Sequence, residues 1–229
     1  MNTNSVHHKK TGKYLHDIIL GGQDGLVNVL GVILGVAAAS GGDTRLIIAT
    51  GLAATFAESI SMAAVAYTST LASKEFYEGE KRKEQWEIEH VPDEEEQEIR
   101  TIFSQKGIQG ETLDTVVATI KGNKKAWIDI MMKDELGLTP VNRTDAIFSS
   151  VVVGGAAVAG SLVPLAPFLF VSATSGIPLS LVVSALVLFL VGFVKAKVTV
   201  GSPLKSGVQL LIIGILSALA GYFVAALVS

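Results

Sequence analysis

Cysteine is absent from this 229-residue sequence, which excludes disulfide bonds, thiolate metal sites and cysteine redox motifs. Charge is scarce as well, since 17% of the residues are Asp, Glu, Lys or Arg, against roughly 25% in an average soluble domain. The sequence also lacks a nucleotide-binding loop, a nucleophile paired with a base, and a basic patch. Neither an enzyme nor a nucleic-acid-binding protein is expected, and the mean hydropathy of +0.50 indicates a membrane protein.

Long apolar runs account for that hydropathy. They cover residues 18–40, 45–71, 145–164, 177–194 and 207–228. About 20 helical residues, each rising ~1.5 Å, cross the hydrocarbon core of a bilayer, so the runs predict five transmembrane helices. Gly41-Gly42-Asp43 forms a turn that joins the first two into a hairpin, and Pro164 and Pro167 mark the exit of the third.

The charged residues gather in one segment between the second and third runs. Residues 73–142 contain 16 of the 21 Asp and Glu but only 10 of the 18 Lys and Arg. The expected fold is an all-α integral membrane protein in three parts. A tail and two spans occupy residues 1–72, an acidic helical domain occupies residues 73–142, and three spans occupy residues 143–229.

Positive charges in the short loops predict the orientation of these spans. The lysines near the first span and between the last two spans are Lys9, Lys10, Lys13, Lys195, Lys197 and Lys205. Because cytoplasmic loops carry the excess of Lys and Arg, the N-terminus and residues 73–142 are predicted to be cytosolic, with the C-terminus on the other side. The first 16 residues lack the apolar core and cleavage site of a signal peptide and are interpreted as a retained tail.

Two predicted spans contain carboxylates. Asp24 is followed one turn later by Asn28, and Glu58 by Met62, so each pair shares one helix face. A charge in hydrocarbon costs at least ~2.5 kcal/mol and usually lines an ion or proton path, and oxygen ligands with a thioether suit Fe²⁺ or Mn²⁺. Two alternatives remain: Asp24 caps a helix that begins at Gly25, or Glu58 is protonated and bonded to Ser or Thr.

The acidic segment has the pattern of several short helices. Residues 74–90 are predicted to continue the second span as one helix, which ends at Val91-Pro92 because the residue before proline disfavours helix. Asp93 is expected to cap the next helix, with Glu96 completing a capping box, and that helix extends to Lys106. Further helices are predicted at residues 110–120 and 125–136.

Carboxylates in these helices recur at spacings of three and four residues, which place them on shared faces. The groups are Glu80, Glu84 and Glu87, then Glu95 and Glu98, then Met131 and Glu135. Helices packed side by side can bring such faces together around metal ions, as in di-metal bundles. The alternative is a solvated acidic face beside Lys81 and Lys83.

Several motifs in order resemble the vacuolar iron transporter family. They are Asp24-Gly25-Leu26-Val27-Asn28, Ser61-Met62-Ala63 with Tyr67, Pro164-Leu-Ala-Pro167-Phe168 and Ser206-Gly207, with the acidic helical insert between the second and third spans. The resemblance extends from about residue 16 to residue 226.

The resemblance implies a homodimer of five-helix subunits that moves Fe²⁺, often also Mn²⁺, out of the cytosol in exchange for protons. By position in the motifs, it also implies metal ligands in the insert, and it matches Asp24 and Met62 with residues that line the translocation path. The implied ligands of the insert are Glu84, Glu87, Glu95, Glu98, Met131 and Glu135.

One position departs from the family pattern. Many members have a glutamate just before the tyrosine that follows the second-span Ser-Met, whereas this sequence has Val65-Ala66-Tyr67. Glu58 lies on the same helix face as Met62, and the hypothesis is that it replaces the carboxylate missing at Ala66.

The resulting hypothesis is a transporter without a resident cofactor. Cytosolic glutamates concentrate Fe²⁺ or Mn²⁺, with other divalent transition metals as further candidates, and a path formed by Asp24, Asn28, Glu58 and Met62 carries the ion until a proton releases it. The alternatives are a membrane-tethered metal sensor or buffer, and an exporter of a harder ion such as Mg²⁺ or Ca²⁺, which prefers a larger all-oxygen ligand set. A prokaryotic plasma membrane is the expected location, with a vacuolar membrane as the alternative.

Overall fold

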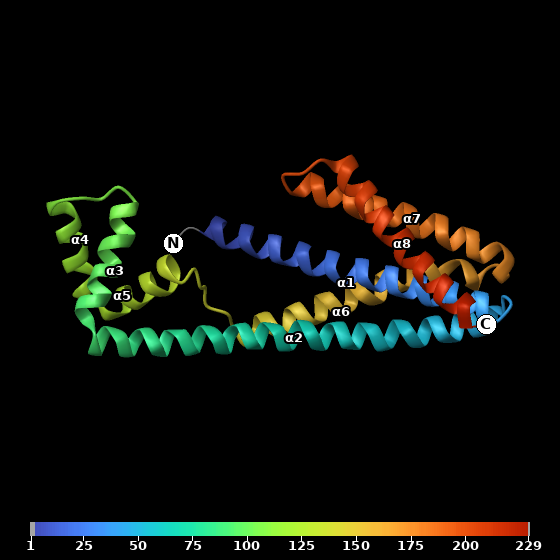
Figure 1. The fold of residues 1–229 in the computed structure, drawn as a ribbon, viewed down its shortest axis with the longest axis horizontal. Coiled ribbons are helices and arrows are strands. Elements are labelled where there is room, and N and C mark those ends of the chain that lie inside the picture. The colour runs from blue at the N-terminus through green and yellow to red at the C-terminus, as the bar shows by residue number, and fades with distance from the viewer. Residues whose placement is uncertain (1–2, 229) are drawn as a thin grey trace. The chain divides into compact units, whose positions relative to one another are not determined.

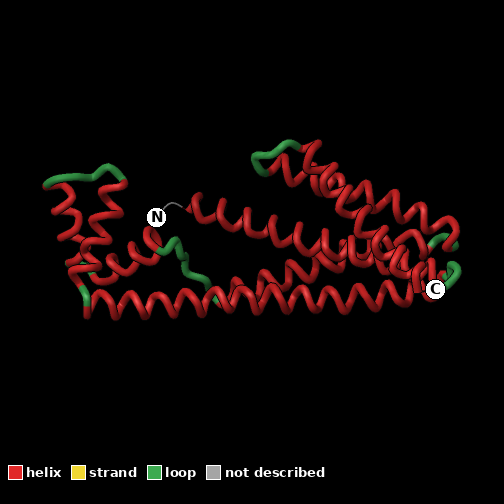
Figure 2. The backbone as a smooth tube through the Cα atoms, in the orientation of Figure 1, coloured by secondary structure: helices red, strands yellow, loops and turns green. Residues whose placement is uncertain are grey.

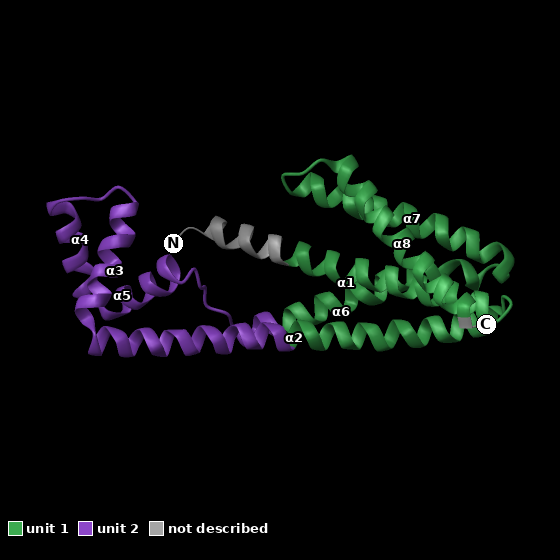
Figure 3. Ribbon diagram, viewed as in Figure 1, with its two compact units in different colours: residues 1–67, 147–229 green, residues 68–146 purple. Residues whose placement is uncertain are grey.

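The computed structural model describes the backbone of residues 3–228 and the side chains of residues 14–227. Within that range the chain is helical, with short loops and no strand (Figure 2). It divides into two compact units (Figure 3): residues 1–67 with 147–229, here called the membrane unit, and residues 68–146, here called the helical unit. The side chains of Lys9, Lys10 and Lys13, on which the predicted orientation partly rests, lie outside the described residues.

Five helices of the described chain are long and apolar enough to cross a membrane, which confirms the predicted number of spans. They are α1 (Thr3–Ala39), α2 (Thr44–His90), α6 (Arg143–Leu165), α7 (Ala173–Val198) and α8 (Pro203–Val228), and a 3-10 turn, η2 (Ala166–Leu169), follows α6 (Figure 1). All five are longer than the apolar runs that predicted them. A helix ends where its backbone is capped or broken, which need not coincide with the end of an apolar run.

The turn between α1 and α2 has the conformation that its sequence demands. Gly41 and Gly42 have φ angles of 62° and 86°, in the left-handed region that glycine enters without steric cost. The Asp43 carboxylate then accepts hydrogen bonds from the backbone amides of Arg45 (2.9 Å) and Leu46 (3.3 Å). Asp43 therefore caps α2, and the predicted turn is confirmed.

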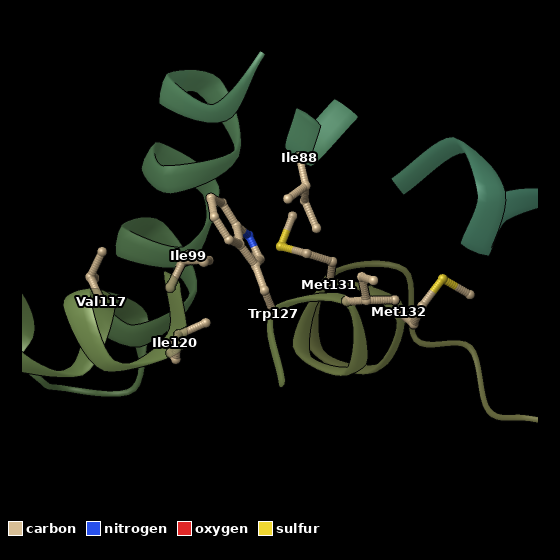
Figure 4. Close-up of a cluster of buried hydrophobic side chains, with 8 residues drawn as sticks. Ile88, Ile99, Val117, Ile120, Trp127, Met131 and Met132 are labelled. Atoms are coloured by element: carbon tan, nitrogen blue, oxygen red, sulfur yellow. The ribbon is translucent and has the colours of Figure 1, made fainter. Parts of the chain in front are cut away.

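The helical unit consists of the last part of α2 and three shorter helices. They are α3 (Pro92–Gln105), α4 (Glu111–Lys121) and α5 (Lys124–Ile130), which continues as a π-helical turn, η1 (Met131–Glu135). Its core is formed by Ile88, Ile99, Val117, Ile120, Trp127, Ile128, Met131 and Met132 (Figure 4). Each of these helices therefore contributes apolar side chains to one small core.

Two predicted helix caps are wrong. Helix α3 begins at Pro92, with Val91 in the capping position and no side-chain cap, because proline is favoured at the first helical position, where its fixed φ fits and its missing N–H is not needed. Asp93 therefore lies inside the first turn, where a negative charge still suits the helix dipole. Asp24 does not cap a helix either, since α1 continues through it from Thr3 to Ala39.

Close contacts between small residues hold the membrane unit together. A Cβ atom added to Gly160 of α6 would lie 2.0 Å from the carbonyl oxygen of Gly22 in α1, and one added to Gly221 of α8 would lie 2.6 Å from that of Gly31. Such contacts let helix backbones approach closely. Gly155 of α6, in contrast, has no described atom within 4 Å of the added Cβ.

A buried carboxylate links α1 to α6. Asp17 has 5% of its surface exposed, and its Oδ2 accepts a hydrogen bond of 2.7 Å from Ser149 Oγ, which is also buried. The sequence interpretation did not single out Asp17, because it lies at the edge of the first apolar run, where an acidic residue is expected to face water.

The glycine contacts predict unequal effects of the same substitution at two neighbouring positions. Gly160→Ala forces its Cβ against the backbone of α1 and should destabilise the protein by about 1–3 kcal/mol, the usual cost of overpacking. Gly155→Ala meets open space and should leave stability unchanged or slightly raised. Thermal unfolding of both variants in the same detergent checks this, and equal melting temperatures would contradict the close packing of α1 against α6.

Candidate metal centres

Three glutamates of the helical unit converge at the turn between α2 and α3. One carboxylate oxygen from each of Glu84, Glu87 and Glu95 lies within 4.8 Å of the others. The core isoleucines explain this placement: Ile88 and Ile99 are both buried in the same cluster, and Glu84 and Glu95 each precede one of them by four residues. Residues four apart share a helix face, so burying the isoleucines brings the two glutamates inward as well.

Glu84 and Glu95 are more buried than carboxylates usually are. Glu84 has 3% and Glu95 has 4% of its surface exposed. The Oε2 atom of each has no hydrogen-bond partner among the described residues. Burying a polar atom without a partner costs about 1–3 kcal/mol, and more when the group is charged. These oxygens therefore need a proton or a cation.

Glu98 and Glu135 extend this group. Glu135 forms a hydrogen bond with Glu98 and lies close enough to Glu84, Glu87 and Glu95 to interact with them electrostatically. Both are exposed, unlike the two buried glutamates. The structure thus gathers the five glutamates that were predicted from spacing and family motif, here called the carboxylate cluster: Glu84, Glu87, Glu95, Glu98 and Glu135.

Met131 lies in the apolar core of the helical unit. Its side chain is fully buried and is directed toward Ile88 of α2, next to Trp127 (Figure 4). It begins the π-helical turn that ends at Glu135, and single π turns occur frequently at functional sites. The thioether of Met131 is therefore part of the apolar core that also buries Ile88 and Ile99, the two isoleucines that share helix faces with Glu84 and Glu95.

Crowding and burial alter the acidity of the cluster. Burial, followed by the negative charges of Glu98, Glu84 and Glu87, raises the pKa of Glu95 to about 8. The carboxyl group of Glu135 is partly enclosed although the residue as a whole is exposed, and this enclosure with the charges of Glu98, Glu84 and Glu87 raises its pKa to about 7. Burial raises the pKa of Glu84 as well. Like charges at this separation disfavour joint ionisation, so at neutral pH the empty cluster retains protons that a divalent cation would displace.

Other acidic residues of the helical unit form ordinary surface ion pairs. Glu89 pairs with Lys124, Glu96 with Lys121 and Arg100, Asp114 with Arg100, and Asp134 with Lys106. The alternative of a solvated acidic face at Glu80, Glu84 and Glu87 is wrong for Glu84, which is 3% exposed. Within the carboxylate cluster, the described residues form one ion pair, in which Glu87 Oε1 lies 3.4 Å from Lys83 Nζ.

A second polar centre lies in the membrane unit, between α1 and α2. Asn28 Nδ2 donates a hydrogen bond of 2.6 Å to Glu58 Oε1. Asp24 lies close enough to Glu58 for the two side chains to interact electrostatically. The hydrogen-bond partner of Glu58 is Asn28, and not the Ser or Thr of the alternative interpretation.

Met62, the fourth predicted residue of the path, lies one turn beyond Glu58 on α2. It is half-buried. The three polar residues Asp24, Asn28 and Glu58 are here called the intramembrane centre, and Met62 shares a face of α2 with Glu58.

Comparison with known sequences identifies the family. A sequence model of the VIT family matches residues 15–226, nearly the whole chain. The chain belongs to the VIT family.

Curated relatives of this VIT-family chain are similar over most of their own length. Vacuolar iron transporter 2 of Oryza sativa subsp. japonica is 36% identical over 216 residues, covering 94% of this chain and 87% of the relative. The vacuolar iron transporter of Centaurea cyanus is 32% identical, covering 97% and 91%. That of Toxoplasma gondii is 31% identical, covering 87% and 69%. These relatives give no support to the expected prokaryotic plasma membrane.

The raised pKa values predict an unusual pH dependence for the metal-free chain. Because the pKa of Glu95 rises from an ordinary 4.5 to about 8 on folding, the folded state binds more protons than the unfolded state between these values. Stability is then full below about pH 4.5 and falls as the pH rises toward 8. Trp86 and Trp127 both lie in the helical unit, so the thermal midpoint of their fluorescence should be lower at pH 8.5 than at pH 6.

Glu95→Gln should flatten this dependence, since the amide does not titrate. Glu94→Gln is the matched control, because Glu94 is exposed and lies one residue away on a different face of α3. A fluorescence midpoint that does not change between pH 6 and pH 8.5 in the wild type would contradict the raised pKa.

Proposed function

We propose that this VIT-family chain transports Fe²⁺, and also Mn²⁺, out of the cytosol across a membrane in exchange for protons. The observation that carries the proposal is the carboxylate cluster, in which the buried Glu84 and Glu95 have oxygens without partners beside a third glutamate. The five spanning helices and the iron-transporter names of the relatives support transport as the purpose of that binding.

The cluster is proposed to capture the ion. The proposed ligands of the ion are the five glutamates of the carboxylate cluster and Met131. Carboxylate oxygens with one thioether form a donor set that an intermediate ion such as Fe²⁺ or Mn²⁺ accepts more readily than Mg²⁺ or Ca²⁺ does. Because the empty cluster retains protons, metal binding releases them, and affinity should increase with pH.

The intramembrane centre is proposed to carry the ion onward. Asp24, Asn28 and Glu58 offer oxygen ligands between α1 and α2, with the Met62 thioether one turn away. The Asp24 and Glu58 carboxyl groups are the proposed protonation sites of the path, because a charge in hydrocarbon is costly without a counter-ion. A divalent ion and a proton then compete for the same oxygens, which provides the physical basis for antiport. In this interpretation Glu58 takes the role of the carboxylate missing at Ala66.

The proposal also includes the orientation of the chain in the membrane and its assembly. Residues 73–142 and the N-terminus face the cytosol, on the side of Lys195, Lys197 and Lys205. The functional unit is a homodimer, because Asn28 is exposed on the surface of the single subunit and Glu58 is only half-buried. An ion path open to lipid is unfavourable, and a second subunit against α1 and α2 would close it.

A carboxylate on the path should be indispensable for flux. Glu58→Ala is expected to lower the initial rate of Fe²⁺ uptake into proteoliposomes at least about tenfold, since even outer-shell groups of metal sites contribute 10–100-fold. Glu75→Ala is the matched control, because Glu75 lies on the same helix and is exposed. Equal rates for Glu58→Ala and the wild type would remove Glu58 from the path.

Capture and transport are separable by a binding measurement. Glu84→Gln combined with Glu95→Gln should weaken Mn²⁺ binding, measured by calorimetry at pH 7.5, by about 10-fold or more, while Glu94→Gln leaves it unchanged. Metal binding in a wild-type chain that supports no flux would favour the alternative, a membrane-tethered metal sensor or buffer.

A further inference from the structure

A groove runs along the membrane unit between α1 and α7. One part of it is a cavity of ≈ 280 Å³ lined by apolar side chains, among them Ile18 and Ile19 of α1 and Val187 and Val191 of α7, together with residues of α6. Two further hollows, of ≈ 260 and ≈ 290 Å³, share Ile19 with it and extend to Lys195. The three spaces therefore form one groove that is apolar over most of its length.

The length of this groove fits half of a bilayer. Along α7 it reaches from Val187 to Thr199, which at ~1.5 Å per residue is roughly 18 Å. One leaflet contributes about half of the ~30 Å hydrocarbon core. A single acyl chain thus has room to lie in the groove with its headgroup at the Thr199 end.

That end of the groove is polar and positively charged. The hollow there is lined by His16, Gln23, Lys195 and Thr199, and Lys195 is exposed. The sequence contains no Asp or Glu after Asp145 and none before Asp17. Helices α7 and α8 therefore supply no counter-ion to this lysine.

The nearest carboxylate on α1 is turned to other partners. Asp17 is 5% exposed and accepts the hydrogen bond from buried Ser149. Its other oxygen lies 3.5 Å from the His16 ring, whose side chain is 73% exposed. Asp17 is thus engaged with Ser149 and His16 and forms no ion pair with Lys195 among the described residues, so the end of the groove remains a site for an anion.

We propose that this groove binds an anionic phospholipid, with one acyl chain along Ile19 and Val191 and the phosphate at Lys195 and His16. Basic pockets between transmembrane helices are a recognised site for acidic headgroups. A second copy of the chain is disfavoured as the occupant, because a two-fold contact brings the same patch of each copy together. With the axis normal to the membrane, the two basic ends would meet at the same depth and repel.

Lipid retention tests this binding directly. The full chain is reconstituted in vesicles of equimolar phosphatidylglycerol and phosphatidylcholine, extracted in mild detergent, and its retained lipid quantified by mass spectrometry. The wild type should retain phosphatidylglycerol in preference, by about fivefold, the order expected for one lysine beside an anionic headgroup. Equal retention of the two lipids by the wild type overturns the proposal.

Two pairs of variants assign the retained lipid to the groove. Lys195→Gln should abolish the preference, whereas Lys125→Gln, an exposed lysine of α5, should keep it. Ile19→Trp fills the groove and should lower the total lipid retained, whereas Leu186→Trp, at an exposed position of α7 outside the groove, should not. A preference that survives Lys195→Gln overturns the proposal even if Ile19→Trp fails to fold.

A cysteine cross-link tests the rival occupant. Because the chain has no native cysteine, Val191→Cys is a single-cysteine variant, and under oxidation in membranes it should remain a monomer on denaturing gels. A disulfide-linked dimer would assign the groove to a second copy and overturn the lipid proposal. Neither readout depends on metal transport, so failure here leaves the proposed function untouched.

Discussion

A buried carboxylate without a hydrogen-bond partner is stable only with a proton or a cation, and the helical unit holds two such groups in contact. Glu84 and Glu95 are drawn inward because they share helix faces with Ile88 and Ile99. Packing of the small core thus enforces an unfavourable electrostatic arrangement. The free energy that the core gains by burial keeps the carboxylates close together, ready for an ion that relieves their repulsion.

The membrane unit also holds carboxylates that need a proton or a cation, but it has fewer of them. Glu58 contacts Asn28 and Asp24, and in hydrocarbon the three residues have no water to replace a missing partner. A proton or a divalent ion would each relieve the repulsion between the two carboxyl groups. In the proposed function, both centres use the same exchange between proton and metal, one in the helical unit and one between α1 and α2.

Much of the fold was predictable from local patterns in the sequence. The five spans and the turn at Gly41 and Gly42 were predictable because apolar length and glycine conformation are local properties. The continuation of α2 to His90 was predictable because nothing before Pro92 interrupts the helix. The start of α3 was not, since Asp93 and Pro92 both offer a helix start and only the structure shows that the proline prevails.

The candidate sites were likewise predictable only in part. Spacing placed Glu84 with Glu87 and Glu95 with Glu98, because these are neighbours on one helix. It did not distinguish the inner glutamates from outer ones such as Glu89 and Glu96, since that depends on which face meets the core. The difference between Gly155 and Gly160 and the burial of Asp17 depend likewise on contacts between distant helices, which a single sequence does not reveal.

The exchange of proton for metal is the central claim, and proton movement in the wild type tests it most directly. Proteoliposomes that contain the protein and an internal pH dye are supplied with external Fe²⁺ without an imposed pH gradient. The account predicts that Fe²⁺ entry is accompanied by proton exit, seen as a rise in internal pH that protein-free liposomes lack. Fe²⁺ entry at constant internal pH would contradict it, because the carboxylates would then pass the ion without giving up a proton.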